Sequence, residues 1–191
     1  MVAGLYVAKS RIRQGILAIF FTNPGEKYYL RELERVLGFS AGSIRRELLK
    51  FQRDGLFLTE PQGNLLYYVL NQKHPLFAEL KGIISKTVGV EGALKGALAD
   101  VKGITCAFIY GSFGSDKQNA HSDIDLMVIG SVNASAVHER LASLEGKLKR
   151  EIHPTFYTPA EYRAKKKKAS GFIRDVLRNP KIMLVGREDD L

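Results

Sequence analysis

Two aspartates, Asp123 and Asp125, alternate with apolar residues at the start of an apolar run, and this spacing constrains the fold more than any other feature. An earlier apolar run, 104–110, ends in Gly111 and Ser112. Alternate residues of a strand point the same way, so both carboxylates lie on one side while the residue between them faces the core. Two neighbouring carboxylates are hard oxygen ligands, which predicts a site for Mg²⁺ or Mn²⁺.

The chain around these aspartates alternates between strand and helix patterns. The turn at Gly111 and Ser112 opens a short helix, whose backbone N–H groups, with the Ser112 hydroxyl, are suited to holding phosphate. Downstream we expect helices at 134–148, 159–169 and 171–178 and strands at 150–158 and 181–185. This alternation predicts an α/β unit with a mixed sheet of about four strands.

A Gly-Ser turn, a short helix and a Ser-Asp-x-Asp strand together resemble the signature of the polymerase-beta-like nucleotidyltransferase superfamily, in its minimal prokaryotic form. The resemblance covers residues 104–186. It implies a divalent metal and a nucleoside triphosphate as ligands. The residues it implies are Asp123 and Asp125 for metal binding and catalysis, and Gly111, Ser112 and Lys117 for nucleotide binding.

Two departures from that family pattern bear on activity. The arginine expected after the Gly-Ser turn is absent, and Lys117 is an imperfect substitute for it. On the next strand His153 stands where a third carboxylate is expected, and Glu151, two residues earlier on the same face, is the candidate to replace it as a catalytic residue. We therefore expect nucleotidyl transfer to be weak or absent.

The first 73 residues have a different pattern, with three amphipathic helices followed by two β-prone runs. The expected helices are 10–22, 29–37 and 41–54, and the expected strands are 56–59 and 65–70, joined by a hairpin loop at 60–64. This order resembles bacterial winged helix-turn-helix regulators. The resemblance implies that the third helix enters the DNA major groove and that the hairpin is a wing.

The third helix carries a polar and basic stripe opposite its apolar one. The polar stripe consists of Ser43, Arg46, Lys50 and Arg53, and the apolar stripe of Ile44, Leu48 and Phe51. The chain has 29 Lys+Arg and 20 Asp+Glu, a net charge of +9, which favours a polyanionic partner. Most exposed rows of this kind are solvated helix faces; in this context we interpret the stripe as a contact surface for double-stranded DNA.

The fold class that we expect is therefore α+β with two domains. The N-terminal winged helix-turn-helix domain spans 1–73, a helical connector spans 74–103, and the nucleotidyltransferase-like α/β domain spans 104–191. The apolar faces of the connector need a cover, and the second domain or a dimer partner would serve equally well. A homodimer is also the usual way to read two DNA half-sites.

Sequence features favour a reducing, cytoplasmic location without a membrane segment. The continuous apolar run 16–21 has six residues, against roughly 20 for a bilayer crossing, and it is followed by a helix stop at 22–25. The single cysteine, Cys106, lies in an apolar run and cannot form an intramolecular disulfide.

Two functions remain open on the sequence. One is a DNA-binding transcriptional regulator whose nucleotidyltransferase-like domain binds metal and nucleotide as a sensor, or serves as a scaffold, with little or no transfer. The alternative is an active metal-dependent nucleotidyltransferase that modifies a hydroxyl of a protein, as an antitoxin does, or of a small molecule. The basic stripe favours the first function, and the Gly-Ser turn with the two aspartates favours the second.

Overall fold

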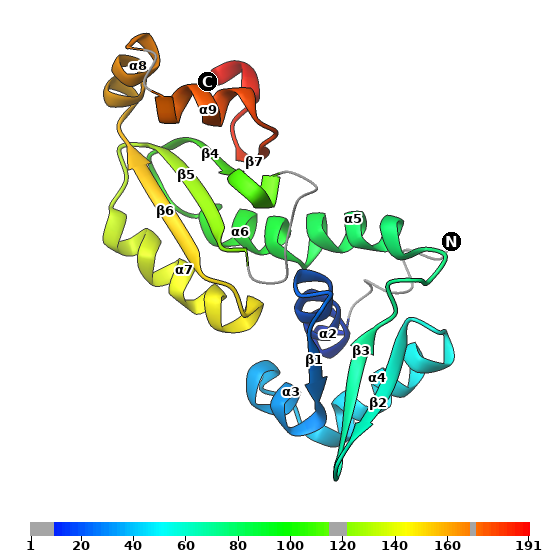
Figure 1. Cartoon of the computed structure of the whole chain (residues 1–191). Helices are drawn as coiled ribbons and strands as arrows, with labels where there is room; N and C mark the ends of the chain where they lie inside the picture. The colour runs from blue at the N-terminus through cyan, green and yellow to red at the C-terminus, as the bar shows by residue number, and fades with distance from the viewer. Residues whose placement is uncertain (1–9, 115–121, 169–170) are drawn as a thin grey trace. The chain divides into compact units, whose positions relative to one another are not determined.

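A computed structural model of the chain describes residues 10–114, 122–168 and 171–191. Contacts divide the chain into two compact units, Met1–Ala93 with Gly146–Lys149 and Leu94–Glu145 with Arg150–Leu191. The boundary between them falls inside helix α6 (Val90–Leu98). Figure 1 shows the elements of each unit.

The described part of the N-terminal unit contains the four helices α2 to α5. Three short strands, which form a small sheet, alternate with these helices along the chain. Its elements are α2 (Arg11–Thr22), β1 (Lys27–Tyr29), α3 (Leu30–Leu37), α4 (Ala41–Arg53), β2 (Phe57–Gln62), β3 (Leu65–Leu70) and α5 (Phe77–Thr87). The three antiparallel strands have the order β1-β3-β2. Ser10 caps α2 through its side chain, and Gly38, at φ +69°, ends α3 in the left-handed conformation.

The helices and strands of this unit share one apolar core. Ile44, Leu48 and Phe51 of α4 are buried, as the helical periodicity predicts. They pack in one cluster with residues of α2 such as Phe20, whose ring meets that of Phe57 edge to face at 4.5 Å. The three helices and the hairpin expected from the sequence are therefore confirmed as elements.

Two details of the small sheet differ from the sequence prediction. Strand β2 continues through Pro61 to Gln62, so the expected five-residue loop shortens to a turn at Gly63 and Asn64. Gly63 makes this tight turn possible because its φ is +58°, a conformation that L side chains disfavour. Strand β1 was not predicted; its three residues pair with β3 some forty positions away, as in Lys27 with Val69.

The C-terminal unit is built on a four-stranded sheet. Its elements after α6 are β4 (Ile104–Tyr110), the 3₁₀ helix η1 (Gly111–Gly114), β5 (Ile124–Gly130), α7 (Ala134–Leu148), β6 (Ile152–Tyr157), α8 (Pro159–Lys167), α9 (Gly171–Arg178), β7 (Ile182–Val185) and η2 (Glu188–Asp190). The strand order is β6-β5-β4-β7. β5 pairs with β6 in parallel, whereas β4 pairs antiparallel with β5 and β7. The predicted α+β class and mixed sheet are confirmed.

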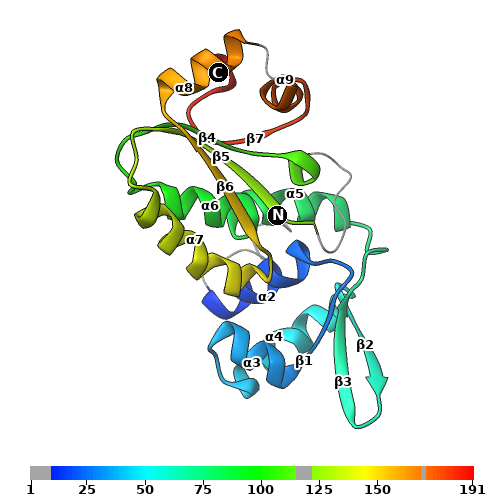
Figure 2. The same ribbon diagram turned by 60° about the vertical axis from the view of Figure 1, so that its left-hand side comes forward.

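Helices cover both faces of this sheet. Figure 1 and Figure 2 show α8 and α9 on one face and α6 and α7 on the other. On the α8/α9 face, Phe108 and Met127 pack with Tyr162 of α8 and with Ile173 of α9. Because the residues between them in β4 and β5 are also buried, these two central strands are apolar on both faces, and their polar residues lie near the ends.

Of the helices in the described ranges, none combines the length and the apolarity that crossing a bilayer requires.

Candidate functional site

The two aspartates lie at the start of β5, where three strands meet. Asp125 stands opposite Tyr110 of antiparallel β4 and beside His153 of parallel β6. Since paired residues of neighbouring strands lie on the same face, these three side chains share the α8/α9 face of the sheet. Asp123 precedes the strand by one residue and is exposed, and Glu151 holds the equivalent position before β6.

Three exposed side chains form a cluster of metal-ligating type. Ligand atoms of Asp123, Glu151 and His153 all lie within 4.8 Å of one another. The Nε2 atom of His153 is 3.4 Å from Oδ2 of Asp123 and 3.6 Å from Oε2 of Glu151. More than half of each side chain is exposed, so a ligand can reach all three.

Backbone contacts hold the starts of β5 and β6 together. The N–H of Ile124 donates to the carbonyl of Glu151 at 2.9 Å. The buried Arg150 donates from its guanidinium to the carbonyl of Ser122, also at 2.9 Å. The residues on either side of Asp123 are therefore both tied to the segment that carries Glu151, which limits how far the two carboxylates can separate.

Gly111 allows the turn after β4 to approach Asp125. Its φ is +73°, and a Cβ built at this position would lie 2.5 Å from Oδ2 of Asp125. Any other residue would be strained in this conformation and would displace the carboxylate. The Gly-Ser turn thus has a structural reason to carry glycine, namely the close approach of its backbone to the second aspartate.

The environment of Asp125 disfavours its charge when no cation is bound. Partial burial raises the pKa of Asp125, the neighbouring His153 lowers it, and the Asp123 carboxylate raises it again. Burial also raises the pKa of Tyr110, and a hydrogen bond with Thr155 lowers it. The negative charge of Asp125 raises the pKa of Tyr110 further. A carboxylate that is partly desolvated and close to another carboxylate is stabilised by a divalent cation.

The donor set fits a divalent cation. In the cluster, Asp123 and Glu151 offer the hard oxygen ligands that Mg²⁺ and Mn²⁺ take, and His153 adds a nitrogen ligand. Asp125, which pairs with His153, offers a further carboxylate on the same face. Imidazole binds transition metals better than Mg²⁺. Mn²⁺ can therefore take both the carboxylate and the imidazole ligands, whereas Mg²⁺ is suited to the carboxylates alone.

The expected nucleotide-binding residues are only partly described. Gly111 and Ser112 lie in η1, directly after β4, and both are exposed. Lys117 lies outside the described residues. Sequence reasoning treated His153 as a loss, whereas in the structure it joins the cluster; the alternation of Glu151 and His153, matching that of Asp123 and Asp125, was the signal.

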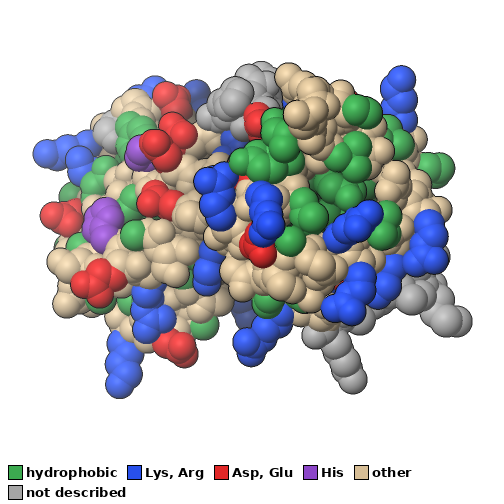
Figure 3. Space-filling view, turned by 90° about the horizontal axis from the view of Figure 1, so that it is seen from below, with side chains coloured by type: hydrophobic (Ala, Val, Ile, Leu, Met, Phe, Trp, Pro, Cys, Tyr) green, Lys and Arg blue, Asp and Glu red, His purple; other side chains and the backbone are tan. Residues whose placement is uncertain are grey.

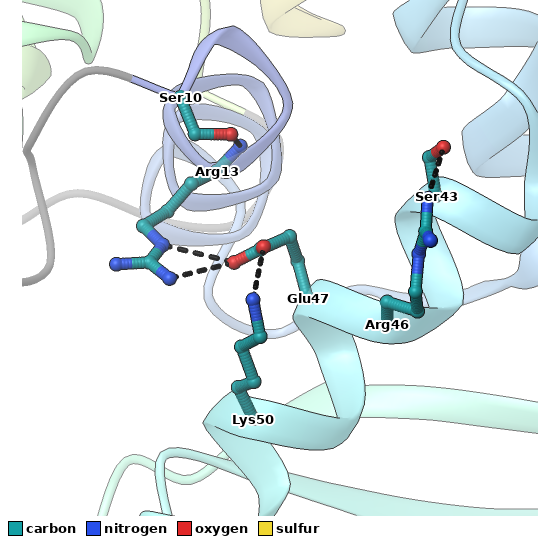
Figure 4. Close-up of polar contacts among 6 residues, drawn as sticks. All are labelled: Ser10, Arg13, Ser43, Arg46, Glu47 and Lys50. Carbon is teal, nitrogen blue, oxygen red and sulfur yellow. Dashed lines mark hydrogen bonds and ion pairs between the residues drawn. The ribbon is translucent and has the colours of Figure 1, made fainter.

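The residues expected to contact DNA lie on α4, and three of them, Ser43, Arg46 and Lys50, have polar contacts with neighbours (Figure 4). Arg46 donates to Oγ of Ser43 at 3.2 Å, and both lie near the start of the helix. Lys50 forms a 2.7 Å ion pair with Glu47, whose carboxylate also accepts from Arg13 of α2. Charge on Lys50 is therefore partly balanced within the fold.

The exposed face of α4 also contains residues that the sequence analysis did not select. Arg45 is exposed, like the predicted Arg46 and Arg53, and Leu49, 42% exposed, falls between these arginines on the helix. The hairpin adds exposed Leu58, Leu65 and Leu66. Figure 3, seen from below, shows hydrophobic side chains gathered among Lys and Arg side chains. This surface is mixed, basic and apolar, rather than a purely cationic stripe.

Comparison with known families places the C-terminal part of the chain. Residues 93–185 match the family model described as Polymerase beta, Nucleotidyltransferase. The chain therefore contains a nucleotidyltransferase-like domain, as the resemblance of its Gly-Ser turn and aspartate pair implied. A comparison with curated proteins finds no match.

Two solved structures resemble about half of the chain. One is a toxin–antitoxin structure with AMP-PNP, at 20% identity and a TM-score of 0.39, covering 52% of this chain and 76% of that one. The other is a mutant of the toxin–antitoxin MntA-HpeT, at 17% identity and a TM-score of 0.40, covering 53% and 77%.

Proposed function

We propose that the C-terminal unit is a metal-dependent nucleotidyltransferase, which transfers a nucleotidyl group from a nucleoside triphosphate to a hydroxyl of a protein or of a small molecule. The observation that carries this proposal is the cluster of Asp123, Glu151 and His153 at the starts of β5 and β6. Asp125 pairs with His153 on the neighbouring strand and lies against the Gly111 turn. A third carboxylate is the component that the sequence left in doubt, and its position supports the active alternative over a sensor or scaffold.

Each residue has a role that follows from its place. Asp123 and Asp125 would hold the divalent cation, and His153, which clusters with Asp123 and pairs with Asp125, would be a further ligand. When bound, the cation would offset the negative charge of the triphosphate during transfer. Gly111 and Ser112 present backbone N–H groups, and Ser112 its hydroxyl, to the triphosphate at the start of η1.

Glu151 is the candidate general base. Its side chain is the most exposed of the cluster, at 77%, which leaves it accessible to an incoming acceptor. In the proposed step the acceptor oxygen bonds to the α-phosphorus, the bond from that phosphorus to the bridging oxygen breaks, and pyrophosphate leaves. The hydroxyl proton passes to the Glu151 carboxylate.

The transfer assay uses the full chain with each nucleoside triphosphate labelled at the α or the γ position, Mn²⁺ or Mg²⁺, and proteins of a cell extract as acceptors. Label should pass to an acceptor from the α position only. Asp123→Asn should abolish transfer, and Glu151→Gln should lower it by roughly 10²–10⁴-fold, the usual contribution of a general base.

The matched control is Glu139→Gln, which makes the same change at an exposed position of α7 in the same unit. It should leave transfer unchanged. Labelling from the γ position would indicate phosphoryl transfer instead, and labelling that survives in Asp123→Asn would place the chemistry elsewhere.

We infer a second function, DNA binding, for the N-terminal unit. It is favoured by the exposed Arg45, Arg46 and Arg53 of α4, which lie away from the buried Ile44 and Leu48. The order of helices and the β1-β3-β2 sheet support a winged helix-turn-helix arrangement, in which α4 is the recognition helix and Ser43 lies near its start. In this arrangement the regulator and transferase functions belong to different units of one chain.

The DNA test measures duplex binding by the full chain at several salt concentrations. Arg46→Ala/Arg53→Ala should weaken binding and lower the slope of log K against log salt by about 1 for each lost phosphate contact. Lys50→Ala should have the smaller effect, because Glu47 already balances its charge. Lys73→Ala/Lys86→Ala removes two exposed charges elsewhere in this unit and is the control; equal weakening by both pairs would mean that α4 is not the contact surface.

A further inference from the structure

Two aromatic rings in contact, those of Tyr110 on β4 and Phe172 on α9, lie on the same face of the sheet as Asp125; we call this pair the aromatic wall. Tyr110 pairs with Asp125 across β4 and β5, and its hydroxyl lies 3.3 Å from Oγ1 of Thr155 on β6. Since β5 separates β4 from β6, the Tyr110 side chain extends across β5 on the face that carries Asp125. The ring therefore stands directly beside the second aspartate.

The wall ends in an exposed ring. Phe172, the second residue of α9, packs edge to face against Tyr110 with centroids 5.8 Å apart, yet it remains 46% exposed. Tyr110 itself is 9% exposed and also meets Phe108 at 6.3 Å. A buried, hydrogen-bonded tyrosine thus supports a phenylalanine whose free surface faces solvent.

We propose that Phe172 is the stacking surface for the base of the nucleoside triphosphate, held in place by Tyr110. This inference rests on the proposed nucleotidyltransferase function and assigns to it a residue that neither the aspartate motif nor the metal cluster includes. The contact from Asp125 through Tyr110 to Phe172 leads from the metal-binding carboxylates to the exposed ring.

The chemistry of Phe172 predicts which nucleobases the site prefers. Phe172 has no hydrogen-bonding group, and every base has a π-face, so stacking on it accepts all four bases. A purine offers the larger face and should bind more tightly than a pyrimidine. Because Tyr110 already fixes the ring, little conformational freedom is lost when the base stacks.

The test compares two probes by calorimetry on the full chain with Mn²⁺: nucleoside triphosphates, and inorganic tripolyphosphate, which has no base. Phe172→Ala should weaken nucleoside triphosphate binding by roughly 5- to 150-fold, the range for loss of one base–aromatic stack. It should leave tripolyphosphate binding unchanged and reduce the difference between ATP and CTP. Phe172→Trp should retain tight binding.

The control Leu76→Ala removes another exposed apolar side chain, in the N-terminal unit, and should change neither affinity. If the parent binds both probes equally, or if Phe172→Ala leaves ATP affinity unchanged, the stacking proposal is wrong while the carboxylate site stands. A Phe172→Ala variant that binds ATP normally but shows a higher KM for a protein acceptor would assign the ring to acceptor docking instead. If the parent binds neither probe, the proposed function fails together with this inference.

Discussion

Replacing Gly111 with alanine should separate stability from function at the carboxylate site. An L side chain in the left-handed region is disfavoured by about 1–2 kcal/mol, and the lower freedom of the unfolded chain offsets about 0.4–1 kcal/mol of this. Gly38, at φ +69°, provides a matched control, because Gly111 has φ +73° and a Cβ at Gly38 meets nothing within 4 Å. Both Gly111→Ala and Gly38→Ala should lower the free energy of unfolding by about 1 kcal/mol.

Only the Gly111 variant should lose function. Its new Cβ would lie 2.5 Å from Oδ2 of Asp125, so the carboxylate has to retreat by about 1 Å to reach an ordinary contact distance. A short side chain can make that move with little further loss of stability. However, a misplacement of this size in a reacting site lowers the rate by about 10²-fold.

The assay combines denaturant unfolding with Mn²⁺-nucleotide calorimetry and the transfer reaction for both glycine variants. Gly111→Ala should bind Mn²⁺-nucleotide weakly and transfer about 100-fold more slowly than Gly38→Ala at equal stability. If the two variants bind and transfer alike, the Asp125 carboxylate is not part of the site and the reasoning is refuted.

Three further predictions concern the C-terminal unit. Burial raises the pKa of Asp125, so its neutral form stabilises the fold below the ordinary value of 3.8, and this contribution is lost as pH rises through the raised pKa. Asp125→Asn without metal should therefore resist denaturant better than the parent at pH 7 but not at pH 3, unlike the exposed control Asp100→Asn. Burial raises the pKa of Cys106 to about 11, so at pH 8 the native thiol should not react with a disulfide reagent until the chain is unfolded. Thr158 and Glu161 form a capping box at the start of α8, and Thr158→Ala should lower the free energy of unfolding by about 1 kcal/mol in a denaturant titration.

Local patterns predicted the elements well and their pairing less well. The apolar spacing of Ile44, Leu48 and Phe51 predicted α4, and the apolar run after Asp123 predicted β5, which begins at Ile124. Strand β1 was missed because three residues carry little periodicity, and its strand character depends on pairing with β3. Short elements are stabilised by long-range contacts that sequence windows do not contain.

The same limit explains what was missed in the two candidate sites. Whether Glu151 lies near Asp123 depends on the parallel register of β5 and β6, which composition and spacing do not specify. Lys50 is exposed on α4, as the helical angle predicted. Its carboxylate partner Glu47 also binds Arg13, 34 positions away in the sequence, and only the tertiary structure reveals that contact.

The central claim is that Asp123, Asp125 and Glu151 form the metal-nucleotide site of a nucleotidyltransferase. Anomalous X-ray scattering from crystals of the full chain grown with Mn²⁺ and a non-hydrolysable nucleoside triphosphate would test it most directly. We predict a manganese peak bound by Asp123 and Asp125, with Glu151 beside it and the triphosphate at Gly111 and Ser112. A peak elsewhere, or nucleotide bound away from the start of β5, would contradict the claim.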